Sequence, residues 1–455
     1  MKAIILAAGS GTRMKSDLPK VLHPLAGKPM INYVIDTCFE AGIKDIVVVV
    51  GKGGEAVKEA INRPVNFVWQ HQQLGTGHAV LCAKEYIAPD DRIVVLCGDS
   101  PLITSKFLKD LFDFQLKEKA QNVVVAARVP DPAGYGRVIT TDSGEFVDII
   151  EDKELAPDQR SINLMNTSVF MSTGKELLYG LERLDNNNSK QEYYLTTIPH
   201  MVMKSGMKVA VYNAPDYQQF LGINSQKQLA EATAVLRHRI IDRHFENGVV
   251  ISDPSTVYID ADAEIETGVI LHPGVMLYGK CRIDKGAIIG PYAQITDSQV
   301  GPGSIVRNSL LEGVQIGADC QVGPYAYLRE GTVIGDRCRI GDFVELKNST
   351  LGSDTKAAHL AYIGDAQVGD GVNFGCGAVT VNYDGTKKHL TVIEDEVFIG
   401  SNVNLIAPVE VRTGAFVAAG STITHEVPED ALAIARERQT NKEGMAKKLK
   451  NGYKA

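Results

Sequence analysis

The chain has 455 residues, of which 44% are hydrophobic and 22% charged, with a formal net charge of −8. This length is more than one ordinary core needs, so two domains are expected. The negative charge argues against a nucleic-acid surface, so an anionic ligand would have to be bound by basic residues clustered at its site. No membrane-spanning stretch is visible, and the Met-Lys start runs straight into a strand pattern, so no secretory signal is expected.

The first half of the chain alternates short apolar runs with stretches of helical length. Ala3–Ala8, Ile46–Val50 and Ile93–Cys97 are β-rich and unalternating, which is typical of buried parallel strands. Pro29–Ala41 and Thr76–Tyr86 are the helical stretches between them. The order β-α-β-α predicts an α/β domain that binds ligands at the carboxyl ends of its strands.

A glycine-rich loop with basic residues follows the first strand. Residues 9–20 read GSGTRMKSDLPK, and the glycines would let backbone N–H groups approach phosphate oxygens while Arg13 and Lys20 supply charge. The loop lacks the Gly-Lys-Ser or Gly-Lys-Thr of a Walker motif, and Met14 stands where a dinucleotide fingerprint has its third glycine. From these residues alone, a tight strand-to-helix connection is the alternative.

A helix is predicted from about Ser225 to Phe245. It opens with Ser225 and, three residues on, Gln228, the pattern of a capping box. We expect a first domain over residues 1–224, a linker helix over 225–250 and a second domain over 251–455.

Aliphatic residues in the second half recur at an interval of six, a period foreign to helices and ordinary strands. The first run comprises Ile259, Ile265, Leu271, Leu277, Ile283, Ile289 and Ile295. Runs from Ile316 to Leu346 and from Ile393 to Ile423 keep the period, after a slip in register and an insertion. Such repeats must stack to bury their aliphatic rows, so the pattern predicts a β-helix with three hexapeptides per coil.

The seven cysteines are scattered without a Cys-x-x-Cys pair. Cys281, Cys320 and Cys338 occupy the small inward position of a hexapeptide, where core packing is the expected role. This usage fits a reducing, cytoplasmic compartment.

Several strings of the chain resemble a known family. Residues 6–14, LAAGSGTRM, with Pro19-Lys20 are similar to the signature of the sugar-1-phosphate nucleotidyltransferases. Strings beginning at six later positions come in the order of one branch of that family: Gln70, Gly98, Tyr135, Glu151, Asn166 and Gly222. With the hexapeptide repeats, the chain resembles the bifunctional N-acetylglucosamine-1-phosphate uridyltransferase and glucosamine-1-phosphate acetyltransferase family over nearly its whole length.

This resemblance implies a fold and a pair of reactions. The fold is an α/β Rossmann-like nucleotidyltransferase domain followed by a left-handed parallel β-helix. The β-helix would acetylate glucosamine-1-phosphate with acetyl-CoA, and the first domain would then transfer uridylyl from UTP, giving UDP-N-acetylglucosamine and pyrophosphate. A homotrimer formed through the β-helix is implied, with neither nucleic acid nor membrane as partner. The alternatives are a nucleotidyltransferase whose β-helix serves only oligomerisation, and a scaffold that lost both chemistries.

For the first domain, the resemblance implies Arg13 and Lys20 as catalytic cations, and Asp99 with Asn224 as ligands of Mg²⁺. Mg²⁺ prefers oxygen ligands, although a lone Asp after a strand is more often a turn former. The implied binding residues for UTP and UDP-N-acetylglucosamine are Leu6, Ala7, Ala8, Gly9, Lys20, Gln70, Gly75, Thr76, Gly136, Glu151, Asn166 and Asn224. Among them, the Gln70 amide suits the edge of uracil.

A buried cation or imidazole rarely stabilises a β-helix, so residues of this kind in the repeats indicate function. His359 is implied as the general base that takes a proton from the sugar amine. The implied binding residues for glucosamine-1-phosphate are Arg329, Lys347, Tyr362 and Asn373. Those for acetyl-CoA are Cys376, Asn382, Tyr383, Ser401, Ala419 and Arg436. From the residues alone, His359 is more often a packing residue.

The insertion at residues 382–389, NYDGTKKH, carries an Asp-Gly turn signal and is expected to project from the prism. The Lys-rich tail after Arg436 receives no role. Three residues depart from the family pattern: Cys376 replaces Ala, Ser168 replaces the Gly that follows Asn-Thr, and Cys97 replaces a Tyr. If Cys376 lines the site, alkylation of its thiol should reduce acetyl transfer.

Overall fold

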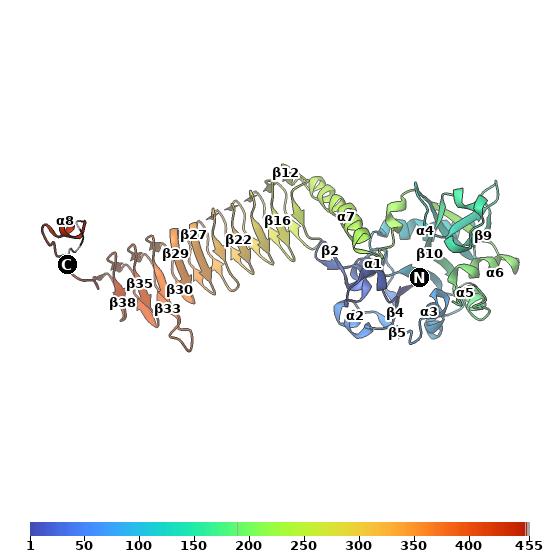
Figure 1. The fold of residues 1–455 in the computed structure, drawn as a ribbon, viewed down its shortest axis with the longest axis horizontal. Helices are drawn as coiled ribbons and strands as arrows, with labels where there is room; N and C mark the ends of the chain where they lie inside the picture. The colour runs from blue at the N-terminus through green and yellow to red at the C-terminus, as the bar shows by residue number, and fades with distance from the viewer. Residues whose placement is uncertain (189, 451, 453–455) are drawn as a thin grey trace. The chain divides into compact units, whose positions relative to one another are not determined.

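A computed structural model describes residues 1–188, 190–450 and 452 (Figure 1). The chain divides into two compact units, Met1–Arg239 and Ile240–Ala455. The division falls within α7 (Gln226–Glu246), the helix predicted to join the domains. Half of the predicted capping box forms, since the backbone N–H of Gln228 donates to Ser225 Oγ at 3.3 Å, whereas the Gln228 side chain accepts from Asn224 N at 2.9 Å.

The first unit is built on a mixed sheet in the order β11-β7-β10-β6-β1-β4-β5. These strands are β1 (Lys2–Ala7), β4 (Asp45–Val50), β5 (Asn66–Trp69), β6 (Arg92–Cys97), β7 (Asn122–Arg128), β10 (Leu164–Thr173) and β11 (Val209–Ala214). The parallel pairing predicted for the first strands is confirmed for β1 with β4 and with β6. The sequence missed that β10 runs antiparallel to both β6 and β7. A ribbon of β8 (Arg137–Thr140) and β9 (Phe146–Ile150) extends from β10.

Helices cover both faces of this sheet. They are α1 (Met30–Glu40), α2 (Gly54–Ala60), α3 (Thr76–Cys82), α4 (Ser105–Glu118), α5 (Gly174–Leu181) and α6 (Ile198–Lys204). Successive β1 residues point to opposite faces, so Ile5 packs in the cluster that includes Ile31 of α1 and Leu108 of α4. Ile4 packs in the other cluster, with Val80 of α3. The result is a three-layer α/β unit, and the two helical stretches expected from the sequence are observed as α1 and α3.

The second unit is a left-handed parallel β-helix of short strands from β12 (Val250–Ile251) to β39 (Leu432–Ala433) (Figure 1). Each coil pairs with the next in parallel, as Ile265 pairs with Ile283, 18 residues further on. This spacing confirms three hexapeptides per coil. The aliphatic residues of the repeat are buried, with Leu277 and Ile289 fully inaccessible to solvent. Cys281, Cys320 and Cys338 are buried and free of disulfides, as expected of inward packing residues.

The insertion leaves the coil between β32 (Val379–Val381) and β33 (Thr391–Ile393). Residues 383–388 are exposed, and Tyr383 and Lys388 form an antiparallel bridge across its base. Figure 1 shows this loop projecting from the β-helix near β33, as predicted. The tail carries one short helix, α8 (Met445–Lys450). Among the residues that the structure describes, none of the helices is long and apolar enough to cross a membrane.

Candidate active sites

A cavity of about 330 Å³ lies at the carboxyl ends of β1 and β6 and beside the start of α3. Its lining includes nine residues that the sequence assigned to this site: Leu6, Ala7, Ala8, Gly9, Lys20, Gln70, Gly75, Thr76 and Asp99. The chain reaches this edge because β1 and β6 are parallel neighbours, so the loops after both strands emerge together. The structure therefore brings the predicted loop and the predicted metal ligand to one place.

The cations and the oxygen ligands of this site form one cluster. Lys20 Nζ donates to Asp99 Oδ2 and, at 2.6 Å, to Asn224 Oδ1. Arg13 donates to the same Asn224 oxygen at 2.9 Å. The side chains of Lys20 and Asp99 are only 12% and 19% exposed. A carboxylate and an amide oxygen thus converge on a single cation, the donor chemistry that suits a hard metal ion.

Glycines allow the close approach of backbone that builds this cluster. Gly11 has φ of +60°, and a Cβ there would lie 2.7 Å from Lys20 Cβ. Gly75, at φ of +109°, would place a Cβ 2.6 Å from Tyr193 O. A side chain at either position would clash or strain the backbone. The glycines therefore set the positions of Lys20 and of the loop before α3.

Two glutamines connect the segments that line the cavity. The Gln70 amide donates to Gly75 O at 3.1 Å, which ties the end of β5 to the start of α3. The Gln73 amide donates to Ala8 O at 2.6 Å. Sequence reasoning missed Gln73, although it lies within the string that begins at Gln70. Its signal was its position three residues beyond a predicted ligand residue.

The residues expected to hold the sugar lie together beside the β8–β9 ribbon. Asn166 N donates to Gly136 O at 2.8 Å, and a Cβ at Gly136 would lie 3.8 Å from Glu151 Cα. Thr196, which sequence reasoning missed, donates its hydroxyl to Glu151 Oε1 at 3.2 Å. Burial raises the pKa of Glu151 above its usual value. This half-buried carboxyl is placed to accept from a hydroxyl or amide of a ligand.

In the second unit, three cations converge on a cavity of about 480 Å³. Its lining includes Arg329, Lys347, Lys388 and Asp365. The ammonium group of Lys388, followed by burial, lowers the pKa of Lys347. Arg329 is held by Glu345 at 2.9 Å. Sequence reasoning missed Lys388 because it lies in the inserted loop, 41 residues from Lys347 along the chain.

The expectation that the unusual residues of the β-helix are buried is wrong. Arg329, Lys347 and Tyr362 are half-buried and His359 is exposed, because their positions point away from the inward aliphatic row. Asn382, by contrast, is buried and donates to Asp365 Oδ2 at 2.6 Å and to Tyr362 Oη at 3.3 Å. It ties the base of the inserted loop to the face that carries Lys347.

His359 lies on β29 (Lys356–Gly364) and is paired in register with Asp342 of β27 (Arg339–Lys347). Its Nδ1 lies 2.9 Å from Asp342 Oδ1. His359 and Asn373 are not among the residues that line the cavity of the three cations. Asn373 lies on β31 (Asn373–Phe374), the next strand beyond β29 in its sheet.

Three of the residues expected to bind acetyl-CoA recur at one position in successive coils. Asn402 N donates to Cys376 O, and Gly420 N donates to Ser401 O, each at 2.8 Å. Arg436 closes the series by donating to Ala419 O at 2.5 Å. Tyr383 stands apart in the inserted loop, where it is 57% exposed. The structure thus places Cys376, Ser401, Ala419 and Arg436 along one line of the β-helix.

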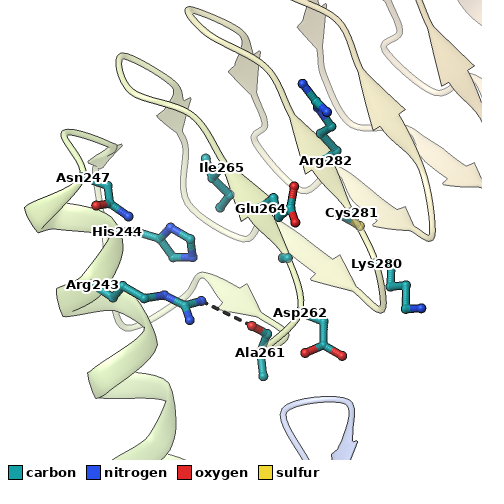
Figure 2. Close-up of a pocket in the computed structure, with 11 residues that line it drawn as sticks. Arg243, His244, Asn247, Ala261, Asp262, Glu264, Ile265, Lys280, Cys281 and Arg282 are labelled. Carbon is teal, nitrogen blue, oxygen red and sulfur yellow. Dashed lines mark hydrogen bonds between the residues drawn. The ribbon is translucent and has the colours of Figure 1, made fainter. Parts of the chain in front are cut away.

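A further cavity, of about 770 Å³, lies where the end of α7 meets the first coils (Figure 2). Arg243 donates across it to Ala261 O at 3.3 Å, and Asp262 with Lys280 line its rim. Both ring nitrogens of His244 are buried without a hydrogen-bond partner. Burial, followed by the charge of Arg243, lowers the pKa of His244 to about 4. No motif of the sequence pointed to this cavity, and its mixed charges favour no ligand class.

The described residues contain no group of three or more His, Cys, Asp or Glu side chains that could hold a metal ion. Metal binding at Asp99 and Asn224 would thus need substrate oxygens or water to complete the coordination.

Family models match both units. The MobA-like NTP transferase domain matches residues 3–188. The bacterial transferase hexapeptide model (six repeats) matches residues 313–348, and the hexapeptide repeat of succinyl-transferase matches residues 391–425.

Among solved structures, a putative glucose-1-phosphate thymidylyltransferase from Bacillus anthracis in complex with a sucrose is 22% identical. It covers 52% of this chain and 94% of its own, with a TM-score of 0.43. A likeness of this size carries no argument about the fold or the site.

Curated relatives match almost the full length of the chain. The bifunctional protein GlmU of Clostridioides difficile (strain 630) is 46% identical over 98% of this chain and 97% of that protein. The bifunctional proteins GlmU of Geobacillus sp. (strain WCH70) and Clostridium novyi (strain NT) are 45% and 48% identical, each over 98% of both chains. With both units matched and their candidate sites assembled, the chain belongs to the bifunctional GlmU family that its sequence motifs indicated.

Proposed function

We propose that the two reactions of this bifunctional transferase run at two separate sites, one in each unit. The β-helix acetylates glucosamine-1-phosphate with acetyl-CoA. The first unit then transfers uridylyl from UTP to N-acetylglucosamine-1-phosphate and releases pyrophosphate. The observation that carries this proposal is that each unit gathers its own cationic cluster, Arg13 with Lys20 in one and Arg329 with Lys347 and Lys388 in the other.

In the first unit, a phosphate oxygen of the sugar phosphate attacks the α-phosphorus of UTP. A new P–O bond forms, the bond to the bridging oxygen of the β-phosphate breaks, and the electron pair leaves with pyrophosphate. No protein nucleophile is needed, since positioning and charge neutralisation supply most of the catalysis. Arg13 and Lys20 neutralise the charge that develops on the phosphate oxygens.

Asp99 and Asn224 would hold Mg²⁺ in this site. Their oxygens already converge on the Lys20 ammonium, so the donor set fits a cation. When bound, the metal supplies charge neutralisation at the phosphates. Lys20 is then free to contact the phosphate chain rather than the Asp99 carboxylate.

Recognition of the nucleotide and the sugar is assigned to opposite ends of the site. Gln70, beside Gly75 and Thr76, reads the uracil edge through its amide and nearby backbone groups. Gly136, Glu151 and Asn166 hold the N-acetylated sugar. Leu6 to Gly9 contact the nucleotide through backbone N–H groups at the end of β1.

In the β-helix, His359 accepts a proton from the amine of glucosamine-1-phosphate, which must be neutral to attack the acetyl thioester. The nitrogen forms a bond to the acetyl carbon, and the thiolate of coenzyme A leaves. Arg329 and Lys347 bind the sugar phosphate, with Tyr362 and Asn373 on the sugar. The coenzyme lies along the line of Cys376, Ser401 and Ala419, and contacts Asn382, Tyr383 and Arg436.

The β-helix also assembles the protein into a homotrimer in this proposal. Tyr325 and Phe343 stack with ring centroids 5.8 Å apart, and each is 59% exposed. Leu360 extends this apolar stripe with 57% exposure. A neighbouring subunit would remove the stripe from water. We place the enzyme in the cytoplasm, in keeping with its seven free cysteines.

A split assay on wild type, Asp99→Ala and His359→Ala tests the two-site proposal. Thiol release from acetyl-CoA with glucosamine-1-phosphate reports the first reaction. Pyrophosphate release from UTP with N-acetylglucosamine-1-phosphate reports the second. Each substitution should silence one assay and leave the other, so that each variant is its own folding control. If wild type releases pyrophosphate but never thiol, the β-helix serves only assembly and the role of His359 is wrong.

A further inference from the structure

The strands that carry His359 are arranged so that one carboxylate meets the imidazole. β27 and β29 are parallel neighbours in successive coils, and their register places Asp342 directly beside His359. Asp342 Oδ1 lies 2.9 Å from Nδ1 of the ring. Both residues sit next to a left-handed residue, Phe343 at φ of +59° and Leu360 at φ of +31°, so both occupy the same corner of the prism.

The chemistry of this pair fixes the state of the ring. An ionised carboxylate only accepts hydrogen bonds, so the ring nitrogen facing it, Nδ1, carries the hydrogen. The other nitrogen, Nε2, then holds a lone pair that can accept a proton. The hydrogen bond from His359 lowers the pKa of Asp342, and the charge of Arg339 acts in the same direction, so the carboxylate stays ionised. On the other side of His359, Gly377 N donates to Leu360 O, which brings the Cys376 segment alongside.

We infer that Asp342 is a positioning residue for acetyl transfer: it holds His359 as the Nδ1–H tautomer, aims Nε2 at the substrate amine and stabilises the protonated ring. This inference rests on the proposed role of His359. Within one subunit, Asp342 and His359 are 42% and 59% exposed, and ion pairs exposed to this degree contribute little stability. Neither the repeat pattern nor the sequence motifs gave Asp342 a role.

The test compares Asp342→Ala, which removes the acceptor, with Asp342→Asn, which keeps an acceptor oxygen but removes the charge. Asp354→Ala is the matched control, because Asp354 likewise bonds to a side chain of the neighbouring coil, Arg337, at 2.7 Å. For Asp342→Ala we expect kcat of thiol release to fall about 10- to 100-fold, with KM for glucosamine-1-phosphate within about 2-fold. Asp342→Asn should retain more activity, and Asp354→Ala should match wild type. Pyrophosphate release should be unchanged in all three.

Nitrogen-15 NMR of the imidazole supplies a readout that a structural role would not move. The Nδ1–H tautomer of His359 should dominate in wild type and lose that dominance in Asp342→Ala. A wild-type kcat in Asp342→Ala, together with an inactive His359→Ala, would overturn the inference alone. Full acetyl transfer by His359→Ala would instead overturn the role of His359, and the inference with it.

Discussion

The two units assemble their sites by opposite means. In the first unit, the hydrogen bonds of the catalytic cluster join residues 204 positions apart, as between Lys20 and Asn224, and 79 apart, as between Lys20 and Asp99. In the β-helix, the bond between Asp342 and His359 spans 17 positions, and that between Asp365 and Asn382 also spans 17. One site is made by folding distant loops together. The other is formed by residues that lie side by side on neighbouring coils of the β-helix.

This difference predicts how each site responds to change. A site built from distant loops depends on the packing of the whole sheet that positions them. A site built on a solenoid depends on the two or three coils that contain it, because each repeat contacts only its neighbours. The two units should therefore differ in how far a local defect spreads.

The largest expected effect comes from Lys20→Ala in the first unit. Loss of this cation should reduce kcat for pyrophosphate release by about 100- to 1000-fold and leave thiol release unchanged. The Lys20 ammonium occupies the oxygens of Asp99 and Asn224. Its removal should therefore also increase the affinity of the protein for Mn²⁺ in the absence of nucleotide, measured by electron paramagnetic resonance. Lys15→Ala, an exposed lysine of the same loop, is the control. Unchanged Mn²⁺ affinity would contradict the assignment of Asp99 and Asn224 as ligands.

Core truncations should show how far a defect spreads. Ile5→Ala in the central strand β1 and Leu277→Ala in the β-helix each remove a fully buried side chain and should cost about 2–5 kcal/mol of unfolding free energy. Hydrogen exchange should accelerate across the whole sheet for Ile5→Ala. For Leu277→Ala it should accelerate only in the coils of Ile259 and Ile295, its neighbours in register.

Leu116→Ala, at a position 60% exposed, should change neither exchange nor stability and serves as the control. If hydrogen exchange in Leu277→Ala accelerates along the entire β-helix, the solenoid unfolds as one cooperative body. The two units would then not differ in how far a local defect spreads.

The same contrast explains what the sequence could predict. The period of six is a local signal, and it was sufficient for the β-helix, its inward cysteines and the projecting loop. The α/β unit was predicted from short apolar runs, but the antiparallel β10 was not. Its ten residues, LMNTSVFMST, show no period that distinguishes a reversed strand from a parallel one. Strand direction there is set by pairing across the sheet.

The missed site residues share a physical cause. Thr196 and Gln73 read as ordinary polar residues until folding brings them to Glu151 and Ala8. Asp342 lies 17 positions before His359, whereas the regular coil spans 18, so the pairing does not follow from the period of six. The burial expected for His359 failed because period six identifies inward positions, and this residue falls outside them.

In the second unit, His244 is expected to cause a pH-dependent loss of stability. Burial lowers the pKa of His244 to about 4, so its folded imidazole stays neutral where the unfolded one becomes charged. The stability from this group is complete above a pH of about 6.5 and is lost as the pH falls towards 4. At pH 4 the loss should reach about 3 kcal/mol.

Urea unfolding at pH 7 and at pH 4 measures this loss. The single tryptophan, Trp69, reports the first unit by fluorescence, so a circular-dichroism transition without a fluorescence change reports the second. His244→Leu should remove the extra loss at pH 4, and His425→Leu, at an exposed position, should retain it. Equal pH dependence in His244→Leu and wild type would show that other groups set the acid stability.

The smallest effect is expected at Ser168, one of the residues that depart from the family pattern. Ser168 has φ of +61° within an irregular part of β10, between Asn166 and Phe170. A left-handed conformation strains a residue with a Cβ, whereas glycine adopts it freely. Ser168→Gly should therefore raise the unfolding free energy of the first unit by about 0.5–1 kcal/mol, measured by Trp69 fluorescence in urea.

Ser172→Gly in the same strand is the control, because its backbone is extended and its hydroxyl donates to Gln121 O at 3.4 Å. Glycine there should lower stability by about 1 kcal/mol, since it gains no relief of strain and loses a contact. Opposite signs at two serines four residues apart would show that backbone conformation, rather than loss of the hydroxyl, decides the outcome. A loss of stability at Ser168 would mean that its backbone is not strained.

The hydrogen bond from Ser168 N to Asn166 Oδ1, at 3.2 Å, links this conformation to the sugar-binding side of the cavity. KM for N-acetylglucosamine-1-phosphate in Ser168→Gly should therefore change less than about 3-fold, because glycine keeps that N–H.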